Sequence, residues 1–342
     1  MNQIKVASLF NKKHFPYEHG SIIDITDYDT IESVLESKDY FDWLIETAKQ
    51  TFNSSIDIRH KFGAIIYPGK HPESKHDVES LKKHGIPLYY LMDNPYNRAT
   101  ADFIFRQIES IYNSVPANTL KLYLGYLDEP IARREIPQNL TIGILGVGNV
   151  GSRVLEQSID RGWNVKYFSR ASQNKFNEMG AIHYDSPISL AKECDILVVC
   201  LPKTSQTKSF VNDQILEVMK PGSCIVSVAA GGVIDEEALF KRIEKGDIYA
   251  AIDTYENEKE YYDKSTFCIN SKPVLDLVLS GRLLLTPHTA YKLETTTKEI
   301  VALLTGAVIN LAAKQAPEDE IVIKVPNEST GSESEYLVKK YQ

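Results

Sequence analysis

The chain has few cysteines, and no two of them have the spacing used by zinc sites and redox-active dithiols. Its 342 residues include four, Cys194, Cys200, Cys224 and Cys268, and none belongs to a C-x-x-C motif. Three of the four lie in or beside apolar segments that we predict to be buried strands. We therefore expect reduced core thiols, no metal site and an intracellular, cytoplasmic protein.

Long hydrophobic runs and an excess of positive charge are also missing. No apolar run approaches the roughly 18 residues of a membrane-spanning helix, and residues 1–13 lack the apolar core of a secretory signal. The net charge of -8 argues against binding to nucleic acid or to an anionic membrane. The composition, 43% hydrophobic and 25% charged, is typical of a soluble globular protein, and the length suits two domains.

The most informative stretch is T-I-G-I-L-G-V-G-N-V-G, residues 141–151. It predicts a buried strand, a turn containing Gly146-x-Gly148-x-x-Gly151, and then a helix over 152–162. We expect Gly146 to allow the tight turn, Gly148 to let a pyrophosphate approach the backbone, and Gly151 to let helix and strand pack closely. The free N–H groups of that helix would point at the phosphates. The stretch therefore predicts dinucleotide binding.

From residue 141 onward a strand–helix–strand pattern repeats. The predicted strands are Thr141–Leu145, Asn164–Phe168, Ile182–Tyr184, Ile196–Leu201, Cys224–Ala229, Tyr249–Asp253 and Leu283–Thr286, with helices that include Asn212–Met219 and Asp235–Lys245. Near-continuous apolar strands such as I-L-V-V-C-L are typical of a parallel sheet covered by helices on both faces. We therefore predict an α/β, doubly wound fold.

The N-terminal part alternates strands and helices as well. The predicted elements are strands at Ile4–Leu9, Gly63–Tyr67 and Pro87–Leu91 and helical segments at Thr30–Gln50, Val78–His84 and Pro95–Val115. A last helix is expected at about Leu293–Ala313, followed from Ala316 by a loosely packed tail rich in Glu, Ser and Lys. We predict a discontinuous substrate domain, residues 1–115 with 291–342, and a dinucleotide-binding domain, residues 116–290.

Several motifs in the second half of the chain occur in a recognisable order. They are G-V-G-N-V-G, L-P-K-T-S-Q-T at 201–207, M-K-P-G at 219–222, A-G-G-V-I-D-E-E-A-L at 230–239, D-T-Y-E-N-E at 253–258 and T-P-H-T-A at 286–290. Over about residues 140–311 this order resembles the D-isomer-specific 2-hydroxyacid dehydrogenases, whereas residues 1–94 match only in general plan. The resemblance implies two Rossmann-like domains with an inter-domain cleft, the first completed by the C-terminal helix. It also implies hydride transfer between a nicotinamide and a carbonyl, usually by a homodimer.

The resemblance assigns the chemistry to a His and a Glu. The His falls on His288, which would protonate the nascent alkoxide because imidazole titrates near working pH. The Glu falls on Glu258, whose carboxylate would orient that imidazole and stabilise its protonated form. Asp253, at a strand end, is expected to support the site. The cofactor contacts expected besides the glycines are Asn149, Val150, Leu201, Pro202, Thr207 and Asp253.

The arginine of the family is missing, because its position is Ala230 in V-A-A-G-G. That arginine normally grips the substrate carboxylate through a charge-assisted, bidentate contact. Removing one partner of a buried ion pair costs roughly 3–5 kcal/mol. The family's glycine-rich loop in the first domain is also replaced, by P-G-K-H-P-E-S-K-H at 68–76.

Three explanations for Ala230 compete. The substrate lacks the usual carboxylate; or another cation replaces the arginine, with Arg98, Lys70 and His71 as candidates; or the protein has little turnover, by nature or through an Arg-to-Ala change. Arg98 on a solvated helix start and the 70–76 cluster as a wet loop are the ordinary interpretations of these residues.

The residues after the second predicted strand indicate which nicotinamide is used. A carboxylate there accepts hydrogen bonds from the ribose hydroxyls and repels a 2′-phosphate, but this chain has Ser169-Arg170. A hydroxyl and a guanidinium suit a 2′-phosphate, although an arginine on a solvated loop would look the same. The pair resembles NADPH-dependent members of the family, so we predict NADPH as the preferred cofactor, with NAD as the alternative.

Two functions follow. The first is an NADPH-dependent reductase of a carbonyl (or imine) small molecule with an atypical carboxylate site. The second is a nucleotide-sensing or partner-binding homologue that has lost turnover. Ala230 favours the second, whereas Glu258 and His288 favour the first, because neither is needed to hold a nucleotide.

Overall fold

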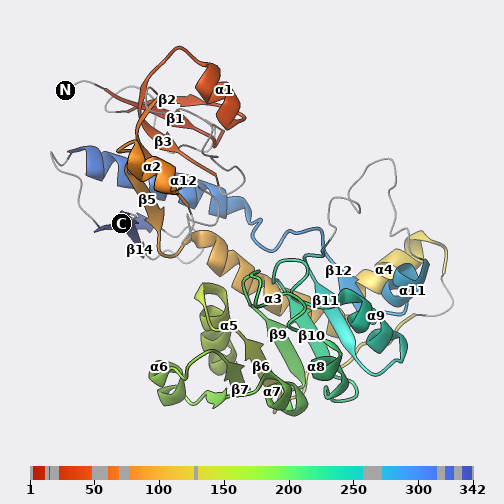
Figure 1. Cartoon of the computed structure of the whole chain (residues 1–342). Coiled ribbons are helices and arrows are strands. Elements are labelled where there is room, and N and C mark those ends of the chain that lie inside the picture. The colour runs from red at the N-terminus through yellow and green to blue at the C-terminus, as the bar shows by residue number, and fades with distance from the viewer. Residues whose placement is uncertain are drawn as a thin grey trace. The chain divides into compact units, whose positions relative to one another are not determined.

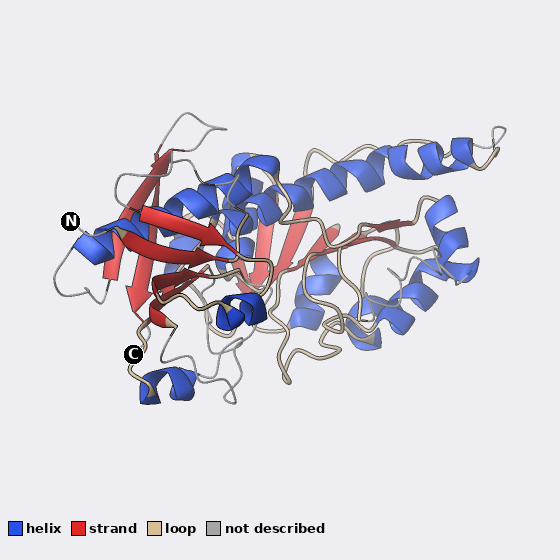
Figure 2. Cartoon of the chain, turned by 90° about the horizontal axis from the view of Figure 1, so that it is seen from above, coloured by secondary structure: helices blue, strands red, loops and turns tan. Residues whose placement is uncertain are grey.

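A computed structural model describes residues 3–11, 15, 23–47, 61–68, 78–126, 130–256, 272–313, 320–326 and 333–340. The chain divides into two compact units, each of which combines strands with helices (Figures 1 and 2). The first unit is Met1–Tyr96 with Leu293–Gln342, and the second is Asn97–Lys292. The first unit ends at Tyr96, the second residue of the long helix Pro95–Asn113, and resumes at Leu293 with the C-terminal helix. The predicted boundaries at residues 115 and 291 stay predictions. Among the described residues, no helix is both long and apolar enough to cross a membrane.

The first unit contains a seven-stranded sheet. Its elements are β1 Ile4–Ser8, β2 Ile23–Asp27, α1 Ile31–Glu36, β3 Phe41–Ile45, β4 Phe62–Tyr67, α2 Val78–Lys83, β5 Leu88–Leu91, α12 Glu294–Ala313, β13 Glu320–Pro326 and β14 Glu333–Lys340. The strand order is β13-β14-β5-β4-β3-β1-β2, with β1 to β5 parallel. Buried side chains of α12 cover one face, and those of α1 and α2 cover the other.

Two predictions for this unit were wrong. The stretch Thr30–Gln50 is not all helical, because α1 ends at Glu36 and F-D-W-L-I forms the interior strand β3, between β1 and β4. The tail after Ala316 is not loosely packed where it is described, because β13 and β14 pair antiparallel and β14 extends the sheet at β5. Val338 of β14 is fully buried, whereas Val322 of β13 is exposed.

The second unit contains the other seven-stranded sheet. Its elements are α3 Pro95–Asn113, α4 Val115–Tyr123, β6 Thr141–Leu145, α5 Asn149–Asp160, β7 Asn164–Phe168, α6 Asn174–Glu178, β8 Ile182–Tyr184, α7 Pro187–Glu193, β9 Ile196–Val199, α8 Asp213–Glu217, β10 Cys224–Ser227, α9 Glu236–Glu244, β11 Tyr249–Ile252, α11 Lys272–Leu279 and β12 Leu283–Leu285. All seven predicted strands of this region are confirmed within two residues at their ends. The predicted helix Pro95–Val115 is interrupted at Ser114, which adopts a left-handed conformation (φ 53°) between α3 and α4.

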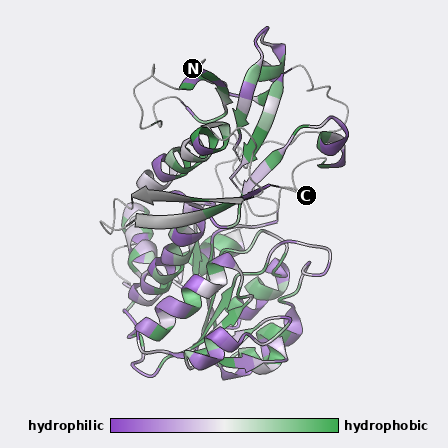
Figure 3. Cartoon of the chain, turned by 90° about the vertical axis from the view of Figure 1, so that its left-hand side faces the viewer, coloured by the Kyte–Doolittle hydropathy of each residue, from purple (hydrophilic) through white to green (hydrophobic). Residues whose placement is uncertain are grey.

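The order β12-β11-β10-β9-β6-β7-β8 makes this sheet doubly wound. Every strand pair in it is parallel. Buried residues of α3, α5 and α6 cover one face, and those of α7, α8, α9 and α11 cover the other. The strands are accordingly hydrophobic, whereas the helices also carry polar side chains (Figure 3).

The order in which the chain adds strands to the sheet switches sides between β6 and β9. Strands β7 and β8 lie on one side of β6, and β9 to β12 lie on the other. In open parallel sheets, ligands bind beyond the carboxyl ends of the strands at such a switch point. The loops that follow β6, β7, β9, β10, β11 and β12 share this edge, and they carry most of the predicted site residues.

Candidate active site

The turn after β6 has the geometry of a phosphate cradle. Gly146 has φ +92°, and its N–H donates to the Phe168 carbonyl at 2.9 Å. A side chain at Gly146 would meet Leu201 Cδ2 at 2.9 Å, and one at Gly151 would lie 1.9 Å from the Gly146 carbonyl oxygen. At Gly148, the N-cap of α5, a side chain would meet no atom within 4 Å. The first and third glycines are thus required by packing, whereas the second leaves room beside a helix N-terminus, which fits a pyrophosphate.

The other expected cofactor contacts lie around this turn. Asn149 and Val150 open α5, and Leu201 follows β9 next to Gly146. In the next loop the Thr207 hydroxyl donates to the Pro202 carbonyl at 2.6 Å. It also accepts the Thr204 N–H at 2.8 Å, so that one side chain closes the loop upon itself.

Ser169 and Arg170 follow β7, the neighbour of β6. The Ser169 hydroxyl donates to the Ala171 carbonyl at 2.6 Å. Arg170 is exposed, and its guanidinium makes no hydrogen bond or ion pair with the residues that the structure describes. Lys175, by contrast, is paired with Glu156 at 2.6 Å. The end of β7 thus presents a hydroxyl and an uncommitted cation, with no carboxylate at the position after the strand.

Asp253 is buried at the end of β11, with 1% of its surface exposed. Its carboxylate accepts the Thr286 hydroxyl at 2.5 Å, the Thr289 N–H at 3.0 Å and the Ala290 N–H at 2.9 Å. These are the residues on either side of His288. The Asp253 carboxylate therefore fixes the 286–290 loop. Its expected support of the active site and its expected cofactor contact stay predictions.

His288 follows β12 in a left-handed conformation, φ +49°, which costs a residue with a side chain roughly 1–2 kcal/mol. Its backbone N–H donates to the carbonyls of Asp253 at 2.8 Å and Thr286 at 3.0 Å, which holds this conformation. The residue is exposed, and its ring stands edge-on to Tyr291 with centroids 5.6 Å apart. The fold therefore presents the imidazole at the carboxyl edge on a loop fixed by Asp253.

Ala230 follows β10 and is exposed. The next residue, Gly231, is packed so closely that a side chain would lie 2.0 Å from the Tyr255 carbonyl oxygen. At Gly232 a side chain would meet Glu256 Oε1 at 3.2 Å and Lys203 Nζ at 3.6 Å. The loop carrying Ala230 thus borders an exposed lysine, Lys203, which the sequence patterns did not single out.

Several predicted residues cannot be placed in this site. Glu258, Lys70 and His71 lie outside the described residues. Arg98 is half-buried in the first turns of α3. Among the described residues, no three His, Cys, Asp or Glu side chains gather as metal ligands.

The structure adds Gln107 of α3 to this edge. Its side chain donates from Nε2 to the Thr286 hydroxyl at 3.1 Å, next to the Asp253 carboxylate. Tyr255 contributes as well, because its hydroxyl donates to the Thr286 carbonyl at 2.8 Å. A glutamine among the apolar residues of α3 was the only signal in the sequence, and it does not reveal a contact 179 positions away.

The described cysteines are protonated thiols. Burial raises the pKa of Cys194, Cys200 and Cys224 to about 12. Cys194 also donates to the Leu190 carbonyl at 2.9 Å. None of the three is therefore a nucleophile at neutral pH.

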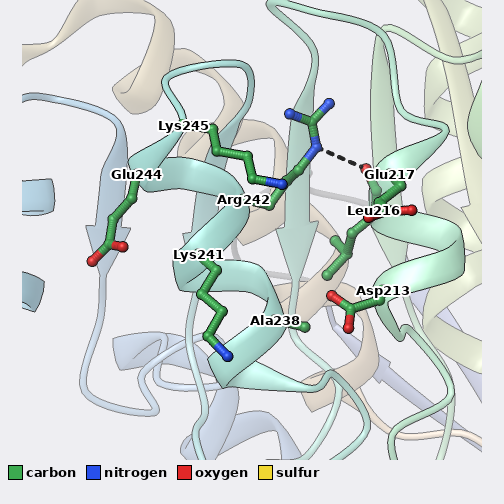
Figure 4. Close-up of a pocket in the computed structure, with 8 residues that line it drawn as sticks. All are labelled: Asp213, Leu216, Glu217, Ala238, Lys241, Arg242, Glu244 and Lys245. Atoms are coloured by element: carbon green, nitrogen blue, oxygen red, sulfur yellow. Dashed lines mark hydrogen bonds between the residues drawn. The ribbon is translucent and has the colours of Figure 1, made fainter.

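A separate hollow lies between α8 and α9 (Figure 4), and none of the predicted site residues lines it. Its lining residues are Asp213, Leu216, Glu217, Ala238, Lys241, Arg242, Glu244 and Lys245. Arg242 crosses it to donate from Nε to the Leu216 carbonyl at 3.2 Å. Its charged walls are those of a solvated helix–helix groove.

The chain is similar in sequence to proteins of one known family. Residues 105–290, more than half of the chain, match the model of the D-isomer specific 2-hydroxyacid dehydrogenase NAD binding domain. A glyoxylate reductase of Thermococcus gammatolerans is 33% identical over 205 residues, 57% of this chain and 60% of that protein. A D-specific alpha-keto acid dehydrogenase of Enterococcus faecium is 25% identical over 66% of this chain and 68% of its own length.

The fold has the same relatives. The NAD-complexed D-isomer specific 2-hydroxyacid dehydrogenase of Lactobacillus delbrueckii ssp. bulgaricus superposes with a TM-score of 0.73 at 18% identity, over 92% of this chain and 98% of that one. The match to the first relative covers less than two thirds of its length, whereas the family model covers the whole glycine turn and carboxyl edge described above. The chain belongs to the D-isomer-specific 2-hydroxyacid dehydrogenase family.

Proposed function

We propose that the protein is an NADPH-preferring oxidoreductase acting on CH–OH donors, which reduces a small carbonyl (or imine) compound and has an atypical carboxylate site. The observation that carries the proposal is the loop of His288, which Asp253 fixes at the same sheet edge as the glycine turn. A dinucleotide held at Gly146–Gly151 has its binding determinants on this edge. Two backbone carbonyls hold His288 in its left-handed conformation, and the buried Asp253 carboxylate holds the two residues that follow it.

The proposed chemistry assigns one task to each residue. A bound nicotinamide supplies the hydride to the carbonyl carbon. His288 donates its imidazolium proton to the carbonyl oxygen, because an alkoxide that is not protonated makes hydride addition unfavourable. Glu258 orients the imidazole, and Asp253 holds the loop. The glycine turn binds the pyrophosphate through backbone N–H groups.

NADPH preference rests on the end of β7. Arg170 is uncommitted among the described residues, and Ser169 has a hydroxyl beside it. The Gly146 N–H hydrogen-bonds to the residue just before Ser169, so this pair lies next to the glycine turn. A fork of N–H donors matches phosphate oxygens, and no carboxylate stands there to repel them. NAD remains the alternative cofactor, since the matched family model is described as an NAD binding domain.

Ala230 decides the substrate class. A methyl group cannot anchor a carboxylate, so the substrate lacks one or a different cation binds it. Arg98, Lys70 and His71 are candidates from the sequence, and Lys203 joins them because its ammonium borders Gly232, two residues from Ala230. An exposed lysine on a loop of this edge can reach a bound anion as a point charge.

The second candidate function is a catalytically impaired homologue that senses a nucleotide or binds a partner, or an Arg-to-Ala variant of an ordinary 2-keto acid reductase. Ala230 is the observation that favours it. Retention of His288 on a fixed loop favours the reductase, because binding a nucleotide does not require that loop.

A homodimer is proposed as the assembly, in the cytoplasm, with no nucleic-acid or membrane partner. Large apolar side chains in and just after α4 are exposed, which suits contact with a second copy. They are Val115, Leu122, Tyr123, Leu124 and Tyr126.

The test is NADPH oxidation against a panel of 2-keto acids, aldehydes and imines, with the wild type, Ala230→Arg and, as the size control, Ala230→Gln. Turnover of a carbonyl by the wild type supports the reductase. Turnover of pyruvate or glyoxylate by Ala230→Arg alone supports the impaired homologue. If neither the wild type nor a variant turns over any compound of the panel, both the atypical reductase and the Arg-to-Ala variant of an ordinary reductase are contradicted. Lys203→Met should raise KM for carboxylate substrates only, and Lys208→Met, on the same loop, should not.

A further inference from the structure

Gln107 is a buried amide with one hydrogen bond to the residues that the structure describes. It lies on the apolar side of α3 with Ile104, Ile108 and Ile111, and it is 2% exposed. Its Nε2 donates to the Thr286 hydroxyl at 3.1 Å. Its Oε1 is buried, and no described residue donates to it.

This arrangement is a poor one for stability. A buried acceptor without a donor costs more than one neutral hydrogen bond returns, because the desolvation of the amide oxygen is not compensated. An unbranched apolar side chain of the same length would fill the space without that penalty. The value of Gln107 to the protein therefore lies in what its one donated bond holds in place.

That bond is the first of a chain leading to His288. The Thr286 hydroxyl accepts from Gln107, so its single proton is directed to the Asp253 carboxylate at 2.5 Å. Asp253 in turn accepts the N–H groups of Thr289 and Ala290, and its backbone carbonyl accepts that of His288. Without the amide, the Thr286 hydroxyl loses the donor that directs its proton to Asp253, and the position of the Asp253 carboxylate is less well fixed.

We propose that Gln107 is a positioning residue for His288, acting through Thr286 and Asp253. The proposal rests on the function proposed above, because His288 must be the proton donor for its placement to matter in turnover. A positioning role affects the chemical step more than the binding of NADPH, since the glycine turn lies on other strands. A misplaced acid lowers kcat even when the substrate still binds.

The test compares Gln107→Met with Gln157→Met. Both substitutions remove a side-chain amide of the second unit. Gln157 is the control, because its Nε2 donates to Asp102 at 2.7 Å, away from the carboxyl edge of the sheet. We expect Gln107→Met to lower kcat at least about tenfold with KM for NADPH unchanged and the melting temperature equal or higher. Gln157→Met should leave kcat unchanged. In Thr286→Val the second change, Gln107→Met, should cause no further loss, because both act on one chain of bonds.

Equal kcat in Gln107→Met and the wild type would overturn the proposal, and so would equal losses in the two glutamine variants. A separate measurement decides the matter if the wild type turns over no substrate. Amide hydrogen exchange at Thr289 and Ala290 should be at least about tenfold faster in Gln107→Met, with core amides such as that of Ile225 unchanged. Unaltered exchange at these two amides would refute the chain of bonds itself.

Discussion

The three glycines of the turn after β6 should separate folding from nucleotide binding. In Gly151→Ala the new methyl would lie 1.9 Å from the Gly146 carbonyl oxygen, and that oxygen belongs to backbone that cannot rotate away. In Gly148→Ala it would meet nothing within 4 Å, and φ of -77° suits alanine. One substitution therefore strains the fold, and the other fills the space expected for a pyrophosphate.

The magnitudes follow from these contacts. Overpacking a core costs roughly 1–3 kcal/mol of stability. The cost at Gly151 should lie at or above the upper end of this range, because the 1.9 Å contact is with backbone. The better helix propensity of alanine returns about 1 kcal/mol. At roughly 2–4 °C per kcal/mol for a unit of this size, Gly151→Ala should lower the melting temperature by about 4–10 °C. Gly148→Ala loses only part of a helix cap, about 1 kcal/mol or less.

Thermal unfolding and NADPH titration of both variants measure the two effects. Gly148→Ala should melt within a few degrees of the wild type and bind NADPH at least about tenfold more weakly, since a methyl displaces the phosphate from the backbone N–H groups. Gly151→Ala should melt lower. Wild-type affinity in Gly148→Ala would refute the placement of the pyrophosphate, and an unchanged melting temperature in Gly151→Ala would refute the packing argument.

Three further changes test other parts of the account. Ser169→Asp with Arg170→Ala should shift preference from NADPH to NADH in fluorescence titration, and an unaltered preference would show that β7 does not bind the 2′-phosphate. Burial raises the pKa of Cys194 to about 12, so the unfolded chain loses this proton first as pH rises above about 9. The contribution of the thiol to the free energy of unfolding therefore declines between about pH 9 and pH 12. In urea unfolding, the free energy of unfolding should fall between pH 8 and pH 10 by about 1 kcal/mol less in Cys194→Ala than in the wild type. Equal losses in the two proteins would contradict this. Leu122→Asp with Tyr123→Asp should convert the proposed dimer into a monomer in gel filtration, and an unaltered elution volume would exclude α4 from the interface.

The second unit was predictable because its local signals agree with its tertiary structure. Strands such as Ile196–Val199 are apolar throughout, and buried parallel strands require this. The glycine turn is encoded within eleven residues, so no long-range information is needed to find it. The first unit was harder. The five residues F-D-W-L-I are too few to show a clear hydrophobic period, and only their pairing with β1 and β4 makes them a strand.

The candidate site divides in the same way. His288 and Ala230 stand in short motifs and could be named from the sequence. Gln107 and Lys203 could not, because their proposed roles depend on neighbours far along the chain: Thr286 for the first and Gly232 for the second. Polar residues that act through tertiary contacts leave no periodic or spaced signal in a single sequence.

The central claim is that His288 protonates the substrate during reduction by a nicotinamide bound at the same sheet edge. Single-turnover oxidation of bound NADPH, with a carbonyl accepted by the wild type, tests it in His288→Ala. We expect NADPH binding to remain within about twofold and the oxidation rate to fall by about two to four decades. An unchanged oxidation rate in His288→Ala would contradict the claim.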